Sequence, residues 1–289
     1  MKVGFVNIFG RPNAGKSTLL NALLGEKLAI VSPKVQTTRH RIKGILNDPG
    51  HQIILSDTPG IIEPKYKLHE RMMQSVKSAL EDADVALLLV DANDDLFEND
   101  ALFASLKLKV PCIVVVNKCD TLKPAALKQV VSFFQEKSYS RSVIAISALA
   151  ATNLDILLKE VESLLPEGEP FFEEDQLTDL PTRFFVGEMI REKIYELYSD
   201  EIPYHTTVLV NEFKEKSTLI KITADIIVQR ETQKGILLGS GGQMIKALGT
   251  AARKDIEAFL GQKVFLELFV KVRPKWRDSD LFLKSYGYS

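Results

Sequence analysis

The chain has 289 residues, of which 45% are hydrophobic and 26% charged, and its formal net charge at pH 7 is −1. This composition is ordinary for a folded globular protein and excludes a disordered chain, and the length predicts about two domains. Because no global basic field exists, any contact with RNA or a membrane surface must use a local patch.

The cysteine content and the hydropathy of the chain indicate in which cellular compartment the protein is expected. Cys112 and Cys119 are too few for a disulfide framework or a Cys-rich zinc site. The chain starts directly with a strand-like run, without the pattern of a signal peptide, and no apolar run approaches the ~18 residues of a membrane span. We therefore expect a cytoplasmic protein.

Up to about residue 165, strand-like runs alternate with helical patterns. The predicted strands are Val3–Phe9, Gln52–Ser56, Val85–Val90, Ile113–Asn117 and Val143–Ile146. The predicted helices span residues 17–25, 68–82, 98–107, 124–136 and 153–165. Continuous Val/Ile/Leu runs are typical of parallel strands buried on both faces, and the alternation predicts an α/β fold with a mostly parallel, doubly wound sheet over residues 1–165.

The pattern changes after this region. Residues 166–181 contain six acidic residues, three prolines and no basic residue, which predicts an extended linker, partly packed through Phe171 and Phe172. The rest of the chain, residues 182–289, predicts a separate small α+β domain in the order αββααβ. Its expected elements are a helix at 183–199, strands at 205–212 and 219–229, helices at 231–238 and 243–259, and a strand at 264–272.

The first motif follows the first strand and reads Gly10-Arg11-Pro12-Asn13-Ala14-Gly15-Lys16-Ser17, with Thr18 beginning the helical pattern. This is G-x-x-x-x-G-K-S, a phosphate-binding loop in which backbone N–H groups and the helix N-terminus cradle phosphates. Lys16 would neutralise the β- and γ-phosphates, and Ser17 would ligate Mg²⁺. The motif predicts a nucleoside triphosphate without choosing which one; a chance glycine turn is the alternative.

Two further segments predict elements that respond to the γ-phosphate. Asp57-Thr58-Pro59-Gly60 closes the second strand, where Asp57 can hold Mg²⁺ and the Gly60 N–H can contact a γ-phosphate. The polar segment Gln36–Arg41 carries a threonine pair that can complete the Mg²⁺ shell only while the γ-phosphate is present. A plain turn and a solvated loop are the respective alternatives.

The base is chosen by the motif Asn117-Lys118-Cys119-Asp120. A carboxylate at Asp120 can accept both the N1–H and the N2 amine of guanine, whereas adenine would leave it unpaired. Lys118 can lay its aliphatic stem over the base, and Asn117 would tie this segment to the phosphate loop. Ser147-Ala148-Leu149 follows the fifth strand, where small residues let backbone N–H groups reach the guanine O6.

A glycine turn marks the second domain. Gly239-Ser240-Gly241-Gly242 separates two helical patterns, as does the G-x-x-G loop that clamps nucleic-acid backbone in type II KH domains. Its interior lacks a basic residue, so attraction to the backbone must come from neighbouring cations. The predicted RNA contacts outside the turn are Lys234, Ile236, Lys246, Arg253, Lys275 and Trp276. Trp276 either stacks on a base or packs internally, and Ile236, Leu237 and Leu238 either line a groove or belong to the core.

Taken together, these motifs resemble the Era family of GTPases over nearly the whole chain. The specific features are GRPNAGKSTLLN, QTTRHRI, DTPG, NKCD, the QLTD linker with RFFVGEMIREKIY, and the second domain. The resemblance implies a Mg²⁺-dependent GTPase that cycles between GTP and GDP, with Lys16, Thr38 and Gly60 acting in hydrolysis. It implies that Thr38 is the switch ligand of the metal, with Thr37 as the alternative.

One position departs from Ras-like GTPases, which carry a water-orienting glutamine where this chain has Ile61, a residue that we also assign to the nucleotide site. In related GTPases with an apolar residue there, a phosphate-loop asparagine helps to bind K⁺ in place of an arginine finger. Asn13 matches that asparagine, which implies slow intrinsic hydrolysis stimulated by K⁺. A hydrogen bond within the loop is the alternative role for Asn13.

The resemblance also implies partners: 16S-type ribosomal RNA near its 3′ end, the 30S subunit during its assembly, and a peripheral contact with the inner membrane. We expect a monomer. Two rival functions are a P-loop metabolic kinase, against which Asp120 argues, and an RNA-binding assembly or structural protein that binds GTP without significant hydrolysis. Intact Lys16, Ser17 and Asp57 argue against the second rival.

Overall fold

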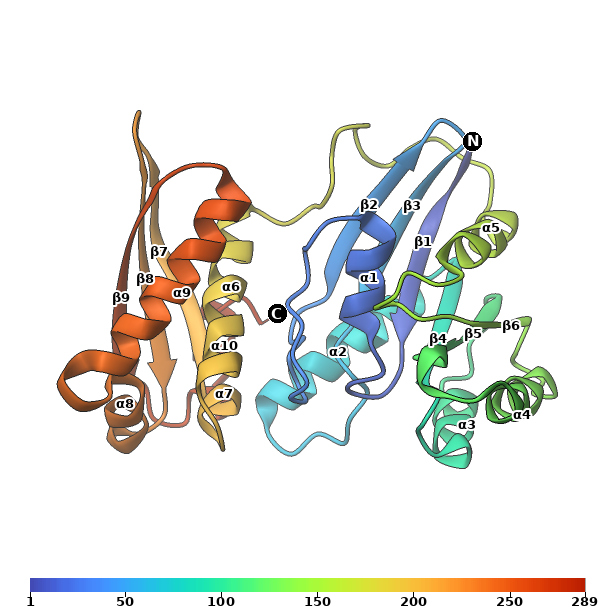
Figure 1. Ribbon diagram of the computed structural model, residues 1–289, viewed down its shortest axis with the longest axis horizontal. Helices are drawn as coiled ribbons and strands as arrows, with labels where there is room; N and C mark the ends of the chain where they lie inside the picture. Colours follow the sequence, from blue (N-terminus) through green and yellow to red (C-terminus); the bar gives the residue numbers. More distant parts are fainter. Residues whose placement is uncertain (289) are drawn as a thin grey trace. The chain divides into compact units, whose positions relative to one another are not determined.

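The computed structural model describes residues 1–288, which form two compact units (Figure 1). The first unit consists of Met1–Pro64 and Met72–Asp179, and the second of Lys65–Arg71 together with the chain from Leu180 onward. No helix among residues 1–288 is long and apolar enough to cross a membrane.

A six-stranded sheet in the order β2-β3-β1-β4-β5-β6 forms the centre of the first unit. Its strands are β1 (Lys2–Phe9), β2 (Ile42–Asp48), β3 (His51–Asp57), β4 (Val85–Asp91), β5 (Cys112–Asn117) and β6 (Ser142–Ala145). Every neighbouring pair is parallel except β2 and β3, which form an antiparallel hairpin. The predicted mostly parallel α/β fold is confirmed, and β2 is the strand that the sequence reading did not assign.

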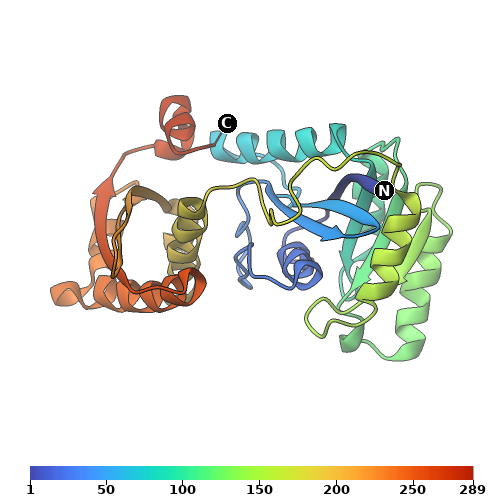
Figure 2. The ribbon, with the colours of Figure 1, turned by 90° about the horizontal axis from the view of Figure 1, so that it is seen from above.

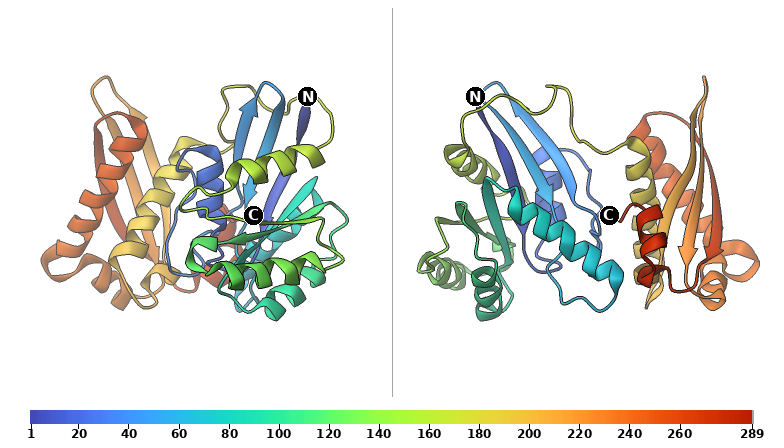
Figure 3. Two further views of the ribbon diagram at one scale, coloured as in Figure 1. Left: turned by 45° about the vertical axis from the view of Figure 1, so that its right-hand side comes forward. Right: turned by 180° about the vertical axis from the view of Figure 1, so that it is seen from behind.

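Helices cover both faces of this sheet. They are α1 (Lys16–Leu24), α2 (Lys67–Glu81), α3 (Leu96–Ser105), α4 (Pro124–Gln135) and α5 (Leu154–Leu164), with a short 3₁₀ turn η1 (Cys119–Thr121). Helices α2, α3 and α4 bury Val76, Phe103 and Phe134 against one face. Figure 2 shows α1 on the opposite side of the sheet from α2, and Figure 3 (right) shows α2 running across the strands.

The strand order explains where a ligand can bind. Strand β1 lies between β3 and β4, so successive connections leave it in opposite directions. In open α/β sheets, the crevice at such a switch point, outside the carboxyl ends of the strands, is the usual ligand site. The phosphate loop, the DTPG segment and the NKCD segment all follow the carboxyl ends of strands β1, β3 and β5.

The acidic stretch after α5 packs on the β2–β3 hairpin of the first unit. The side chain of Gln52 accepts hydrogen bonds from the N–H groups of Phe171 (2.7 Å) and Phe172 (3.1 Å). The N–H of Ile45 donates to the carbonyl of Leu177 at 2.8 Å. The Ile45–Leu177 bond occupies part of the open edge of β2, which would otherwise expose unpaired backbone groups.

The second unit has a three-stranded sheet in the order β7-β8-β9, with β7 antiparallel and β9 parallel to β8. Its elements are α6 (Thr182–Leu197), α7 (Ile202–His205), β7 (Thr207–Glu215), β8 (Ile220–Val228), α8 (Glu231–Leu238), η2 (Ser240–Gly242), α9 (Gln243–Leu260), β9 (Val264–Val272), η3 (Trp276–Asp278) and α10 (Asp280–Ser285). Helices α6, α8 and α9 pack one shared core against β8.

The predicted αββααβ order is confirmed, with two additions. The strand expected from residue 205 begins at Thr207, because Ile202–His205 forms the short helix α7. A further helix, α10, follows β9 and was not predicted. Both additions are too short to show a helical period in the sequence.

Candidate functional site

The phosphate loop follows β1 and passes directly into α1, which begins at Lys16. Gly15 has φ +97°, and a Cβ there would lie 2.2 Å from the side-chain nitrogen of Asn117. Only glycine therefore fits this position, on grounds of both backbone conformation and space. The resulting turn presents the first backbone N–H groups of α1 to a common point, as anion binding requires.

Lys16 is buried within this loop. Its Nζ donates hydrogen bonds to the carbonyls of Arg11 (2.8 Å) and Gly10 (3.2 Å). Burial lowers the pKa of Lys16 to about 8, and the charge of Asp57 offsets only part of that effect. Desolvation disfavours the charged ammonium, and a nearby anion such as a phosphate would restore it.

Three oxygen-bearing side chains from separate elements converge beside the loop. Ser17 Oγ donates to Asp57 Oδ2 at 2.6 Å, Thr38 Oγ1 donates to the same oxygen at 3.1 Å, and the two hydroxyls lie 2.9 Å apart. The other carboxylate oxygen, Asp57 Oδ1, is buried and makes no hydrogen bond among the described residues. Burial is also the main cause that raises the pKa of Asp57.

This arrangement fits a hard cation. Mg²⁺ prefers hydroxyl and carboxylate oxygens, and a buried carboxylate oxygen without a partner is a group that such an ion would satisfy. Thr38, and not Thr37, faces the cluster, because the hydroxyl of Thr37 donates to the carbonyl of Lys34 at 2.7 Å. The geometry therefore favours Thr38 over Thr37 as the metal ligand.

The NKCD segment connects three loops. Asn117 donates through Nδ2 to the carbonyl of Ala14 at 2.9 Å, which is the predicted tie to the phosphate loop, and accepts from the N–H of Ala148 at 2.9 Å. Lys118 reaches the carbonyl of Asn13 at 3.1 Å and forms an ion pair with Asp91. Asp120 stays exposed at the rim, where its carboxylate is available to a ligand.

These segments enclose one cavity of about 520 Å³, a size typical of small-molecule sites. The predicted residues that line it are Pro12, Asn13, Gly15, Lys16, Ser17, Thr18, Thr38, Gly60, Asn117, Lys118, Asp120, Ser147 and Leu149. Lining residues outside the predicted nucleotide set are Ile30, Val31, Ser32, Pro33, Gln36, Thr37 and Thr121. The apolar run before the threonine pair is the signal that indicates Ile30 and Val31.

The remaining predicted nucleotide-site residues are not among those that line the cavity: Gly10, Arg11, Ala14, Asp57, Thr58, Pro59, Ile61 and Ala148. Thr58 Oγ1 donates to the carbonyl of Ile8 at 2.6 Å, which fixes the DTPG segment to β1. Gly60 approaches Pro12 so closely that a Cβ would lie 2.8 Å from the Pro12 nitrogen. The side chain of Ile61 packs on the core beneath α2, so it offers no polar group to a water molecule.

Asn13 links the phosphate loop to the threonine segment. Its Nδ2 donates to the carbonyl of Pro33 at 3.0 Å, and its backbone has φ +65°. Asn13 Oδ1 makes no hydrogen bond within residues 1–288. A carbonyl oxygen at the cavity wall remains available to a cation.

In the second unit, the glycine turn Gly239–Gly242 lies between α8 and α9. Gly241 is exposed with φ +58°, and a Cβ there would meet nothing within 4 Å. Leu237 belongs to the core, whereas Ile236 is half exposed beside the turn. Of the two alternatives for this apolar run, Leu237 therefore takes the core position, and Ile236 is the residue that can line a groove.

Cations near the turn differ in whether they are paired. Lys246, Arg253 and Lys254 are exposed along α9 and form no ion pair in the part of the chain that the structure describes. They border a shallow depression on that helix. Lys271 instead pairs with Asp225 at 2.6 Å, and Lys275 is exposed with φ +55°. Exposed cations without an ion pair among the described residues thus lie on α9 and at Lys275 after β9.

Trp276 corrects one prediction. Its ring is fully buried, its indole N–H donates to the carbonyl of His205 at 3.0 Å, and it lies against Tyr286 and Tyr288. A ring with no exposed face cannot stack on a base, so the predicted RNA contact of Trp276 is wrong and its alternative, internal packing, is right. The helix α10 that follows provides this packing, and it had not been predicted.

The first turn of α2 belongs to the second unit as well. Lys67 forms an ion pair with Asp280 of α10, and Arg71 Nη2 lies 3.1 Å from the same carboxylate. The guanidinium of Arg277 lies 4.2 Å from the ring centroid of Tyr66. Lys67 and Arg71 lower the pKa of Asp280.

Comparison with known families divides the chain in the same order. The family described as 50S ribosome-binding GTPase matches residues 5–118, and the KH domain family matches residues 201–277.

Full-length relatives are similar as well. The chain is 44% identical over 288 residues to GTPase Era of Geotalea uraniireducens, covering 99% of this chain and 97% of that protein. It is 45% identical over 289 residues to GTPase Era of Lacticaseibacillus paracasei, covering 99% and 96%.

Two solved structures match over the whole chain. One is an Aquifex aeolicus Era variant bound to GDP·AlF₄⁻, with a TM-score of 0.96, 42% identity and full coverage of both chains. The other is Era in complex with MgGDPNP and nucleotides 1506–1542 of 16S ribosomal RNA, with a TM-score of 0.95, 43% identity, and coverage of 100% of this chain and 99% of that one.

Proposed function

The chain belongs to the family of Era GTPases, and from this we propose that it is a Mg²⁺-dependent GTP-hydrolysing switch that binds small-subunit ribosomal RNA through its second unit. We propose that residues 1–165 act as the GTPase domain, 166–181 as a linker and 182–289 as the KH-type RNA-binding domain. The role that follows is assistance in assembly of the 30S subunit, in the cytoplasm and as a monomer.

The observation that supports the switch most directly is the convergence of Ser17, Thr38 and Asp57 at one buried point. Bound there, Mg²⁺ would neutralise charge that develops on the phosphates. Thr38 belongs to a loop and Asp57 ends β3, so a metal ion bound by both would tie this loop to the sheet. Loss of a γ-phosphate would release the loop.

Guanine selection rests on Asp120 at the cavity rim, held in place by the Asn117 bonds to Ala14 and Ala148. Lys16, buried against the phosphate-loop carbonyls, supplies the charge that binds the β- and γ-phosphates. The Gly60 N–H would contact the γ-phosphate. With Ile61 packed on the core, no side chain at that position orients the attacking water, which supports slow intrinsic hydrolysis.

We further propose that K⁺ stimulates hydrolysis through Asn13. Its side-chain oxygen is without a hydrogen bond among the described residues, and its amide nitrogen holds the carbonyl of Pro33 close by. Two oxygen ligands on one side of the cavity suit a monovalent cation beside the phosphates. Hydrolysis rates in KCl and NaCl at equal ionic strength test this proposal, since equal rates would contradict it.

The ribosomal subunit follows from the solved relative. That Era structure contains nucleotides 1506–1542 of 16S RNA, which belongs to the small subunit, whereas the family description matching residues 5–118 names the 50S subunit. We give the relative more weight, because it is 43% identical over the whole of this chain, second unit included. A peripheral contact with the inner membrane is part of the proposal but rests on the family alone.

The base-reading assignment is tested by Asp120→Asn. An amide presents a donor where guanine N2 also donates, while xanthine offers a carbonyl there, so preference should move from GTP toward xanthosine triphosphate by about 100-fold or more. Asp155→Asn, an exposed aspartate in the first turn of α5, is the matched control and should leave the preference unchanged. An unaltered preference in Asp120→Asn would refute guanine recognition by this residue.

The rival function is an RNA-binding assembly protein that binds GTP without significant hydrolysis. Phosphate release from [γ-³²P]GTP by purified protein in K⁺ and Mg²⁺, with and without small-subunit RNA, separates the two. Hydrolysis that RNA accelerates supports the switch. Tight GTP binding with no release under either condition supports the rival.

A further inference from the structure

Arg41 lies between the proposed metal ligand and the sheet. It follows Thr38 by three residues and immediately precedes β2, whose first residue, Ile42, pairs with Asp57 in the antiparallel register. Arg41 is therefore the last residue of the threonine segment before the chain joins the sheet. Its position decides how firmly that segment is held at its C-terminal end.

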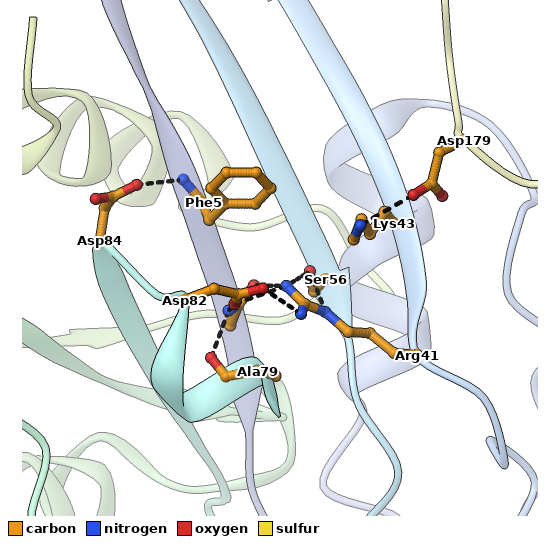
Figure 4. A network of polar contacts seen from close by, with 9 residues as sticks. Phe5, Arg41, Lys43, Ser56, Ala79, Asp82, Asp84 and Asp179 are labelled. Carbon is orange, nitrogen blue, oxygen red and sulfur yellow. Dashed lines mark hydrogen bonds and ion pairs between the residues drawn. The ribbon is translucent and has the colours of Figure 1, made fainter. Parts of the chain in front are cut away.

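The guanidinium of Arg41 is held on two sides (Figure 4). It forms a bidentate pair with Asp82, with Nη1–Oδ2 at 2.5 Å and Nη2–Oδ1 at 2.9 Å. Nε and Nη2 also donate to Ser56 Oγ at 3.1 and 2.9 Å, and Nη2 donates to Asn7 Oδ1 at 3.1 Å. The Arg41 side chain is 12% exposed and that of Asp82 is 41% exposed, so the bonds to Ser56 and Asn7 are partly buried while the pair with Asp82 reaches the surface.

The partners of Arg41 lie on β1, on β3 and just after α2, next to the segments that we propose contact the phosphates. Ser56 is the residue before Asp57 on β3, and Asp82 follows the end of α2, the helix after the DTPG segment. Asn7 completes the network, because its Nδ2 donates to the carbonyl of Ala79 at 2.6 Å and to Asp82 Oδ1 at 2.8 Å. Asn7 and Ser56 are fully buried.

We propose that Arg41 is a positioning residue for the GTP-bound state: it clamps the C-terminal end of the threonine segment to the end of α2, so that Thr38 is held at the metal site. The clamp contacts α2 at its C-terminal end, whereas the DTPG segment precedes the N-terminal end of the same helix. The Arg41–Asp82 contact therefore links the segment that carries Thr38 to the helix that follows Gly60. Gain or loss of the γ-phosphate acts on both ends of this loop.

The chemistry of the clamp requires arginine. A planar guanidinium can pair with both carboxylate oxygens of Asp82 while a third donor reaches Ser56, whereas a lysine ammonium cannot span both. A clamp of this kind predicts a selective effect. When the clamp is removed, the contacts that depend on the γ-phosphate should weaken. The contacts with Lys16 and Asp120, which GDP also makes, should not.

The test compares Arg41→Met, Arg41→Lys and Asp82→Asn with the wild type. We expect Arg41→Met and Asp82→Asn to bind MgGDPNP about tenfold more weakly, a usual size for coupling between two sites, and to bind GDP within about twofold of the wild type. Arg41→Lys should fall between them and the wild type. Hydrolysis at saturating GTP should fall in the same order.

Lys43→Met is the matched control. Lys43 is two residues further along the same chain, and its Nζ pairs with Asp179 at 3.0 Å instead of with α2 (Figure 4). It should bind both nucleotides as the wild type does. Asp82→Asn preserves side-chain volume and leaves Arg41 its bonds to Ser56 and Asn7, so it keeps the test valid if Arg41→Met unfolds.

Two outcomes would overturn the inference. One is equal weakening of GDP and MgGDPNP in the Arg41 and Asp82 variants, which would mean that the network only stabilises the fold. The other is unchanged binding of both. The inference rests on the proposed GTP switch, and the wild type separates the two failures: if it binds GDP and MgGDPNP but the variants show no selectivity, only the clamp is wrong.

Discussion

In the first unit, Lys16 and Asp57 of the candidate site are buried and hydrogen-bonded to neighbouring groups, whereas in the second unit Gly241 of the glycine turn is exposed and Lys246, Arg253 and Lys254 have no ion pair among the described residues. A site for one small ligand gains from fixed donors that are paired before binding. A surface for a long, flexible polyanion gains from exposed charge that reaches many phosphates. Substitutions in the two units should therefore differ in how strongly they change the stability of the fold and how strongly they change ligand binding.

Trp276 should give the largest stability effect, because it is buried despite its place in the basic tail. Trp276→Ala should destabilise the second unit by about 3–5 kcal/mol, whereas Trp276→Phe, which loses the bond to His205, should cost about 1 kcal/mol beyond the lost packing. Thermal or urea unfolding measures both. It is the only tryptophan of the chain, so its fluorescence reports on this ring alone. Quenching on RNA binding would show that the ring reaches a base after all.

A substitution at Lys16 should instead change nucleotide binding strongly and stability little. Lys16→Met should weaken GTP and GDP binding by about 2–5 kcal/mol, because it removes the charge paired with the phosphates. The free energy of unfolding without nucleotide should fall by less than about 1 kcal/mol, since the substitution also removes a buried charge that costs desolvation. Titration calorimetry and unfolding of the same samples test both numbers. A large loss of stability would mean that Lys16 holds the loop together.

A pH dependence follows from the same lysine. Burial lowers the pKa of Lys16 to about 8 from 10.5, and a bound phosphate would raise it again. Above pH 8, the free protein has lost this proton and must regain it to bind the triphosphate. The Kd for GTP should therefore rise, by up to about tenfold per pH unit between pH 8 and 10, with proton uptake.

Calorimetry in buffers of different ionisation enthalpy measures that uptake. Lys16→Met is the control, because it has no proton to gain at this position. Uptake that persists in this variant would assign the effect to another group.

The glycine turn should give the smallest of these effects. Gly241→Asp places a negative charge in the exposed turn, and we expect RNA binding to weaken by roughly tenfold while GTP binding is unchanged. Gly261→Asp is the matched control, because Gly261 also has a positive φ, +64°, and open space, but lies at the other end of α9. Equal RNA binding by the two variants, measured by filter binding, would contradict the assignment of the turn.

Most of the fold could be predicted because each predicted element has a local signal. The β4 run Val85–Val90 and the β5 run Ile113–Val116 are apolar at every position, which indicates strands buried on both faces. Strand β2 carries no such signal: it contains Gly44 and three polar residues, and it exists because it pairs with β3 across a hairpin. Its pairing is a property of the sheet and not of its own residues.

The candidate site divides in a similar way. The chemistry of Lys16, Asp57 and Asp120 could be inferred from residue types at fixed spacing, because those loops are short and their backbone is set by glycines and strand ends. The direction of a side chain in a longer loop could not. Thr37 and Thr38 are identical in type and adjacent, and only the tertiary structure shows that Thr37 bonds to the carbonyl of Lys34 whereas Thr38 bonds to Asp57.

The sequence alone was sufficient for the fold class, the GTPase family and the expectation of guanine, since these depend on local patterns and on the donors and acceptors of single side chains. Tertiary structure was needed for the burial of Trp276 beneath α10, the orientation of Thr38, and the contact between Arg41 and Asp82. Each of these joins residues brought together by packing or by a strand register. Burial and pKa depend on such neighbours, which no local pattern specifies.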